Sequence, residues 1–171
     1  KCIQSLERFR GYLPQSKLDT ICEQAKADEG CTSINGEPLF HIDTKGYAKT
    51  TKKILVFSLI HGDEVDAGAL GRFWLERLST IEPRNDWRVI PVLNPDGFIQ
   101  KTRTNARGVD LNRNFPTADW GALAKANWKQ GGQSPRRFPG DSAASEPEVT
   151  CAMKHIKEFN PNFVVSIHTP L

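Results

Sequence analysis

The sequence has no long apolar run and no internal repeat. Its longest apolar stretch, residues 54–60, covers seven residues and is interrupted by Ser58, whereas a membrane-spanning helix needs about 20. We therefore expect no transmembrane helix. With 38% apolar and 25% charged residues among 171, the composition excludes a collagen-like chain, a coiled coil and a wholly disordered protein. The length predicts one domain that spans residues 1–171.

The sequence also has little excess charge of either sign. Its 23 basic and 20 acidic side chains leave a net charge of +3, and a nucleic-acid-binding module would more often carry a clustered basic excess. We therefore expect no nucleic-acid partner. The densest basic stretch, residues 101–113, is interspersed with asparagine and aspartate, which favours a polar site over a phosphate-binding track.

The four cysteines form no C-x-x-C pair, which argues against a cysteine zinc knuckle. Cys22 and Cys31 could close a small loop in an oxidising compartment; the alternative is four reduced thiols. Because the sequence starts at Lys1 and not at methionine, we expect a processed product. This start and the even number of cysteines slightly favour export to the periplasm, with the cytoplasm as the alternative.

Buried strands and amphipathic helices alternate along the chain. Residues 54–60 (ILVFSLI) and 163–167 (FVVSI) are apolar on both faces, which is typical of strands inside a parallel sheet. Between them we expect a strand at 87–93, where Pro91 indicates an edge or an irregularity, and a tight turn at 94–97. Helices are expected at 18–26, 63–79, 121–128 and from a Ser145 cap to Phe159, and a short strand at 38–42. This order predicts an α/β sandwich with parallel strands.

Two histidines directly follow two of the predicted strands. His61 comes after residues 54–60 and His168 after residues 163–167, and ligands of open α/β sheets bind at the carboxyl ends of strands. Glu64 lies three residues after His61. Two imidazole nitrogens and one carboxylate, with a fourth position for water, form the ligand set of a catalytic zinc site. The pattern alone is weak, because an H-x-x-E spacing also arises by chance and His168 could be an ordinary buried histidine.

The other two histidines have no such neighbours. His41 is expected to be a strand residue without chemistry. His155 is expected to face solvent from its helix, so neither residue is assigned to the predicted metal site.

Five short segments then occur in one order: His61-Gly-Asp-Glu64, Asn94-Pro-Asp-Gly97, residues 108–116 (GVDLNRNFP), Ser145-Glu-Pro-Glu148 and Ser166-Ile-His168. Together they resemble the zinc carboxypeptidase family, of the carboxypeptidase A type. The likeness covers residues 55–168, and residues 1–50 carry none of it. The short spacer between the second and third segments is more similar to small bacterial members, which trim cell-wall peptides, than to digestive enzymes.

The resemblance implies a three-layer α/β/α sandwich with a mostly parallel mixed sheet. It also implies one bound zinc ion, with His61, Glu64 and His168 in the positions of its ligands. Zinc lowers the pKa of its water and polarises a carbonyl group, so this ligand set implies a hydrolase that acts on a peptide substrate.

The resemblance further assigns residues that bind the substrate. Asn112 and Arg113 match the pair that holds its terminal carboxylate, for which a guanidinium is a planar, two-pronged partner. Arg103, in preference to Arg107, is similar in placement to the arginine that stabilises the oxyanion. Asp110 is interpreted as a partner that orients a zinc histidine and not as a ligand.

The sequence departs from the family in two places. The resemblance implies a general-base glutamate and a mobile aromatic residue well after the third ligand, but only residues 169–171 follow His168. We therefore expect a fragment, truncated at its C-terminus, that lacks one or two strands and a closing helix. Asp63 stands where many members carry a basic residue, which predicts a substrate with an extra cationic or amide group, such as a murein peptide containing diaminopimelate.

Three functions are consistent with these residues. The first is a zinc-dependent peptidase or amidase that hydrolyses an amide bond next to a free carboxylate in a cell-wall (murein) peptide. The second is a zinc-dependent deacylase of small N-acyl amino acids. The third is a non-catalytic zinc- or peptide-binding module, because no general-base glutamate is present in this sequence.

Overall fold

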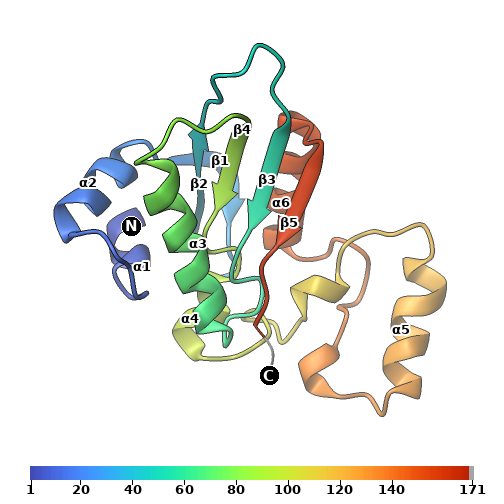
Figure 1. Ribbon diagram of the computed structural model, residues 1–171. Coiled ribbons are helices and arrows are strands. Elements are labelled where there is room, and N and C mark those ends of the chain that lie inside the picture. The colour runs from blue at the N-terminus through green and yellow to red at the C-terminus, as the bar shows by residue number, and fades with distance from the viewer. Residues whose placement is uncertain (170–171) are drawn as a thin grey trace.

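The computed structural model describes residues 1–169, which form a mixed five-stranded sheet between layers of helices (Figure 1). The strands are β1 (Lys26–Thr32), β2 (Pro38–Thr44), β3 (Lys53–Phe57), β4 (Asp86–Ile90) and β5 (Phe163–Ser166). Their order across the sheet is β1-β2-β4-β3-β5. β3 is parallel to β4 and β5, whereas β2 is antiparallel to its neighbours β1 and β4. The predicted α/β class with a mixed sheet is therefore confirmed.

Helices cover both faces of this sheet. They are α1 (Cys2–Leu6), α2 (Gln15–Glu23), α3 (Val65–Leu78), α4 (Pro95–Gln100), α5 (Trp120–Gln130) and α6 (Pro147–Phe159), with short 3-10 helices η1 (Leu111–Arg113) and η2 (Pro135–Arg137). Figure 1 shows α3 in front of the sheet and α6 behind it. Within residues 1–169, none of these helices combines the length and the apolar character that crossing a membrane requires.

Alternate residues of β3 pack against the two helical layers. Val56 packs in the cluster formed with α1, α2 and α3, whereas Leu55 and Phe57 pack in the cluster formed with α6. Successive side chains of a strand point to opposite faces, so a strand covered on both faces is apolar throughout. This confirms a strand in the middle of the sandwich within the predicted stretch 54–60, although β3 ends at Phe57 and residues 58–60 lie beyond it.

The segment after β4 differs from the prediction. β4 ends at Ile90, before Pro91, and it lies between β2 and β3, so Pro91 marks neither an edge strand nor an irregularity within a strand. Residues 94–97 are not a simple turn but the start of α4. The Asn94 side chain accepts a hydrogen bond of 2.9 Å from the Gly97 backbone N–H, and Pro95 occupies the first turn, which is a favourable helix start.

The ends of two other helices also correct the prediction. The residue that caps α6 is Glu146 and not Ser145, and no side-chain hydrogen bond caps the helix. Ser145 Oγ instead accepts a hydrogen bond of 3.0 Å from Asn114. The helix expected at 18–26 begins earlier and ends at Glu23. β1 follows it and was not predicted, because most of its side chains are exposed or half-buried and show no apolar alternation.

β5 lies at the edge of the sheet, although its sequence predicts a buried strand. Among residues 1–169 it pairs with β3 alone. Phe163 is 58% exposed and Val164 is 49% exposed. An apolar run therefore does not distinguish a strand with neighbours on both sides from one that, among residues 1–169, has a neighbour on one side alone.

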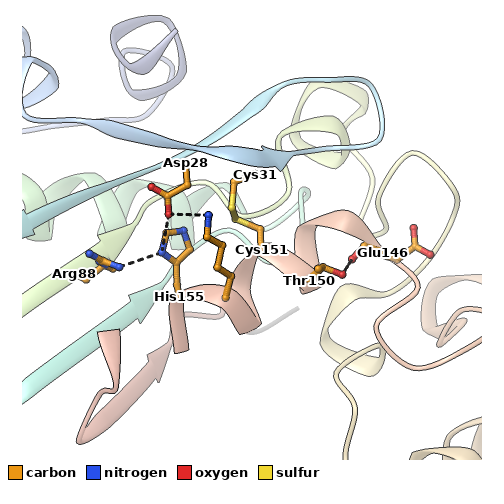
Figure 2. The surroundings of a disulfide bond; sticks show 8 residues. Asp28, Cys31, Arg88, Glu146, Thr150, Cys151 and His155 are labelled. Atoms are coloured by element: carbon orange, nitrogen blue, oxygen red, sulfur yellow. Dashed lines mark hydrogen bonds and ion pairs between the residues drawn. A yellow bond between two sulfur atoms is a disulfide. The ribbon is translucent and has the colours of Figure 1, made fainter. Parts of the chain in front are cut away.

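Two disulfides connect the N-terminal segment to itself and to α6. Cys2 pairs with Cys22, and Cys31 pairs with Cys151 (Figure 2). The expected loop between Cys22 and Cys31 is therefore wrong, and so is the alternative of four free thiols. The two cysteines are close in sequence, but Cys22 belongs to α2 and faces α1, whereas Cys31 in β1 faces α6.

Candidate metal centre

The three predicted metal ligands lie together at the carboxyl ends of β3 and β5. His61 follows β3, Glu64 directly precedes α3, and His168 follows β5. His61 and Glu64 are buried, whereas the His168 side chain is 33% exposed. Gly62 is required here, because a side chain at this position would overlap the backbone of Gly97. This close approach places α4 directly against the segment that carries His61.

The ligand atoms of the three residues converge on one point. His61 Nδ1 lies 2.8 Å from Glu64 Oε1, and His168 Nδ1 lies 3.1 Å from Glu64 Oε2. The two imidazole rings are 4.8 Å apart between centroids, and one donor atom from each of the three side chains lies within 4.8 Å of the others. Two imidazole nitrogens and a carboxylate at these separations fit a zinc ion.

The second nitrogen of each imidazole has a partner of its own. His61 Nε2 lies 3.0 Å from Asp110 Oδ1, and His168 Nε2 lies 3.0 Å from Ser166 Oγ. Such partners fix the ring orientation of metal-binding histidines and leave Nδ1 free to bind the ion. Asp110, which the sequence suggested as this kind of partner, is fully buried. Burial opposes its ionisation, but the hydrogen bond with His61 and the charge of Arg103 hold the Asp110 pKa below its usual value.

Arg103 reaches the same cluster and Arg107 does not. Arg103 Nη1 donates to Glu64 Oε1 at 3.3 Å and Nε donates to Asp110 Oδ2 at 3.2 Å. Its side chain is 12% exposed, whereas that of Arg107 is 58% exposed and lies 3.9 Å from Glu146. Of the two arginines that the sequence offered, Arg103 is the one that places a fixed positive charge beside the ligands.

Asn112 and Arg113 lie farther out, on η1. They line a groove with residues of α5, including Trp120 and Leu123. Arg113 is exposed, and its guanidinium donates only to the neighbouring Asn112 carbonyl, at 3.3 Å. No hydrogen bond or ion pair within residues 1–169 joins either side chain to the three candidate ligands. The two residues connect to the cluster through Asp110, which accepts from the Asn112 backbone N–H, contacts His61 and has its pKa lowered in part by the charge of Arg113.

Asp63, between Gly62 and Glu64, has a partner that the sequence did not reveal. Its Oδ2 accepts a hydrogen bond of 2.8 Å from Arg136 Nη2, on η2. Its other oxygen, Oδ1, is buried and has no hydrogen-bond partner. The Asp63 carboxylate is thus already paired with a cation of this chain.

A buried polar network supports the loop that carries Arg103. Asn105 Nδ2 donates to Glu146 Oε2 at 2.7 Å and to Glu148 Oε2 at 3.3 Å, and its Oδ1 accepts from the Val109 backbone N–H. Burial raises the Glu148 pKa. The sequence predicts only a role at the start of α6 for Glu146 and Glu148, and the one signal for this network is their place in the segment 145–148.

The remaining two histidines lie away from this cluster, where α6 packs on β2. His41 is in β2, as predicted for a strand residue. His155 is fully buried in α6, so the prediction that it faces solvent is wrong. Its ring packs edge-to-face on His41, with 4.7 Å between ring centroids.

The fold and this cluster define the class of protein. An α/β sandwich that brings two histidines and a glutamate together at its strand ends has the donor set of a zinc hydrolase with an open coordination position. The chain belongs to the zinc carboxypeptidase family, whose model matches residues 21–170. Members of this family are hydrolases, and the family implies zinc as the metal.

Curated relatives and solved structures agree with this membership. Murein peptide amidase A of Escherichia coli K12 is 33% identical over 143 residues, which cover 81% of this chain and 57% of the relative. The chain thus spans a little more than half the length of that relative. The structure of murein-tripeptide amidase MpaA from E. coli O157 matches at 27% identity with a TM-score of 0.62, over 86% of this chain and 61% of that one. Carboxypeptidase A from Helicoverpa armigera shares the fold, with a TM-score of 0.72 at 22% identity, over 98% of this chain and 47% of that one.

Proposed function

We propose that this protein is a zinc-dependent hydrolase that cleaves an amide bond next to a free carboxylate in a murein peptide. The convergence of His61, Glu64 and His168 carries the proposal. The likeness to murein peptide amidase A supports the substrate class. When bound, zinc supplies a Lewis acid for the scissile carbonyl and lowers the pKa of water.

His61, Glu64 and His168 would hold the ion, and two further residues would prepare them for it. Asp110 accepts a hydrogen bond from the N–H of His61 Nε2, which would leave the Nδ1 lone pair for the ion. Ser166 orients His168 in the same way. Both contacts hold the imidazole rings in fixed orientations.

Arg103 would stabilise negative charge that develops on the carbonyl oxygen. Its guanidinium is held by Glu64 and Asp110, and a cation fixed in advance costs no reorganisation during the reaction. Asn112 and Arg113 would bind the free carboxylate of the substrate. The family resemblance implies a glutamate as proton acceptor after the third ligand, and the proposal assigns no residue of this sequence to that step.

Asp63 would contribute to substrate choice. Its carboxylate lies next to a candidate ligand, and Oδ2 is held by the half-exposed guanidinium of Arg136. A murein peptide with diaminopimelate carries a cationic amino group that suits this carboxylate. Preference of the full-length protein for ordinary C-terminal peptides over a murein tripeptide would contradict this part of the proposal.

We also propose export to an oxidising compartment such as the periplasm. The two disulfides support it, because such bonds persist outside the reducing cytosol. Mass spectrometry of the protein isolated from its native compartment under alkylating conditions tests it: four alkylated thiols would contradict export.

The test of the catalytic proposal is hydrolysis of a murein tripeptide by the full-length protein loaded with zinc. We expect Arg103→Ala to lower kcat by about 100- to 1000-fold, because a fixed charge at the oxyanion is lost. We expect Arg113→Ala mainly to raise KM, because carboxylate binding is lost. Arg107→Ala is the matched control, since Arg107 is exposed and lies away from the cluster.

The outcomes separate the candidate functions. Faster turnover of an N-acyl amino acid than of the tripeptide would favour a deacylase. Zinc binding without turnover of either substrate would favour a non-catalytic binding module. Equal rates for the Arg103→Ala and Arg107→Ala variants would contradict the catalytic role proposed for Arg103.

A further inference from the structure

One buried side chain, Asn105, closes the turn that joins Arg103 to Asp110. Asn105 is 2% exposed. Its Oδ1 accepts hydrogen bonds of 3.1 Å from the backbone N–H groups of Arg107 and Val109. Its own backbone N–H donates to the Val109 carbonyl at 3.0 Å. The turn therefore folds the chain back on itself and brings Arg103 opposite Asp110, where the two side chains form a salt bridge of 3.2 Å.

The amide nitrogen of Asn105 fixes this turn to the start of α6. Nδ2 donates to Glu146 Oε2 at 2.7 Å and to Glu148 Oε2 at 3.3 Å. Glu146 lies directly before α6 (Figure 2), and Glu148 lies in its first turn. Glu146 is 2% exposed and Glu148 is fully buried. Hydrogen bonds to a carboxylate are stronger than those between neutral groups, so the turn is held on a helix of the sandwich and not only by its own backbone.

Other contacts fix the two ends of the turn. The Arg103 carbonyl accepts from the Gly62 backbone N–H at 3.3 Å and from Asn94 Nδ2 at 3.2 Å. The Asp110 backbone N–H donates to the Phe138 carbonyl at 2.8 Å. Loss of the amide group in the middle would thus leave both ends attached and shift the turn between them, which is a change of position and not of fold.

The two glutamates need a hydrogen-bond donor between them. Burial raises the Glu148 pKa, the charge of Glu146 adds to this rise, and the Asn105 amide opposes it. A third carboxylate in place of that amide would meet two buried acceptors without a donor, which is unfavourable. Asn105→Asp is therefore the substitution that removes this attachment most specifically, because its remaining oxygen can still accept from the backbone of the turn.

We propose that Asn105 is a positioning residue for the proposed zinc centre. By fixing the turn to Glu146 and Glu148, it sets where the Arg103 guanidinium and the Asp110 carboxylate lie. The inference rests on the proposed function, in which Arg103 stabilises the oxyanion and Asp110 orients a metal ligand. The hydrogen bonds of Asn105 reach the turn and α6, so it acts on the reaction through those two side chains. A reaction that depends on a fixed charge is sensitive to small displacements of that charge.

The experiment compares Asn105→Asp with the wild type in the full-length protein, by two measurements. Competition with a chelator gives the zinc affinity, and we expect a loss of about tenfold, because Asp110 no longer orients its ligand correctly. Hydrolysis of a murein tripeptide gives kcat, and we expect a fall of about 10- to 100-fold, because Arg103 is displaced. Asn162→Asp is the matched control, since Asn162 Oδ1 also accepts a backbone N–H, from Lys53 at 2.9 Å. It lies before β5, away from the candidate ligands, so neither quantity should change.

A second substitution tests the direction of the hydrogen bond. In Glu146→Gln the amide oxygen can still accept from Ser145 Oγ, as Glu146 Oε1 does at 2.7 Å, and the amide nitrogen becomes a donor toward position 105. Combined with Asn105→Asp, it restores a donor and an acceptor with their roles exchanged. We expect the combination to recover zinc affinity and kcat to within about threefold of the wild type, since substitutions of residues in contact are not additive. Failure to recover, with circular dichroism showing a folded protein, would overturn the attachment to Glu146.

Asn105→Ala adds no charge and is the second variant in case Asn105→Asp does not fold. It should lower the zinc affinity in the wild-type background but not in the Asp110→Asn background, because Asn105 acts on the metal centre through Asp110. An equal loss in both backgrounds, or no loss in either, would overturn the inference.

The inference and the proposed function fail separately in this design. Normal turnover of the tripeptide by folded Asn105 variants, with unchanged zinc affinity, would overturn the positioning role and leave the proposed function in place. A wild type that binds zinc but cleaves no amide substrate would contradict the proposed function. Loss of zinc affinity in Asn105→Ala would still support the positioning role in that case.

Discussion

At the scale of single residues, the candidate metal centre depends on side chains that orient the metal ligands and are not ligands themselves. Asp110 holds Nε2 of His61 at 3.0 Å and also accepts from Arg103. It therefore sets both the tautomer of one ligand and the position of the cation beside another. The side chains that orient ligands matter here nearly as much as the ligands do.

Asp110→Asn is expected to weaken zinc binding at His61 by about 10- to 100-fold, because loss of such an orienting carboxylate typically costs that much. The measurement is competition for zinc with a chelator of known affinity. Asp119→Asn is the control, since Asp119 is exposed and its side chain makes no capping bond. A change of less than twofold for Asp110→Asn would contradict the role given to this residue.

The burial of His155 predicts that the free energy of unfolding falls in acid. Burial, with the charges of His41, Arg88 and Lys154, lowers its folded-state pKa to about 4, and only Asp28 opposes these effects. Between pH 6.5 and 4 the unfolded chain binds a proton that the folded chain does not, so stability falls as the pH falls. The His155 share of this loss is about 3 kcal/mol.

Urea unfolding in EDTA between pH 7.5 and 4.5 measures this loss. His155→Leu should have a shallower dependence than the wild type over that window, because it removes one of the buried groups that must take up a proton. Parallel curves for the two proteins would show that His155 is already protonated in the folded state.

The sequence predicted functional residues best where residues able to bind a metal directly follow a recognisable strand. His61, Glu64 and His168 follow apolar strands, and parallel strands bring their carboxyl ends to one edge. Asp28, His41 and His155 were not foreseen as a group. Their proximity depends on β1, whose exposed and half-buried side chains gave no strand signal, and on the packing of α6, which no local pattern encodes.

At the scale of elements, β3 and β5 have similar apolar sequences but differ in how far their side chains are buried. Both are short apolar strands, but Phe57 is 3% exposed and Phe163 is 58% exposed. Position in the sheet decides this, because β3 lies between β4 and β5 and is covered by helices on both faces. Strand type could be predicted from the sequence, but neighbour order could not.

Phe57→Ala is expected to cost about 3–5 kcal/mol of unfolding free energy, since it removes a fully buried ring from the cluster beneath α6. Phe163→Ala is expected to cost less than about 1 kcal/mol, because most of that ring is already in water. Equilibrium unfolding in urea compares the two variants directly. Similar losses would mean that β5 is covered in solution.

At the scale of the whole molecule, the residues of the candidate active site and the disulfide that joins β1 to α6 lie in two different regions of the sandwich. One edge of the sandwich, at the strand ends, collects the candidate ligands, Arg103 and Asp63. The region behind the sheet holds the disulfide between Cys31 and Cys151 and the buried pair of histidines. The alternation of strands and helices predicted this sandwich, whereas the antiparallel β1 and β2 and both disulfide pairings required the three-dimensional structure.

We propose that one zinc ion binds among His61, Glu64 and His168. Anomalous scattering from crystals grown with zinc, collected at the zinc absorption edge, tests this proposal most directly. We expect a peak about 2.0–2.1 Å from Nδ1 of both histidines and beside the Glu64 carboxylate. Zinc bound elsewhere in the crystal, with no peak among these three side chains, would show that they do not form the metal centre.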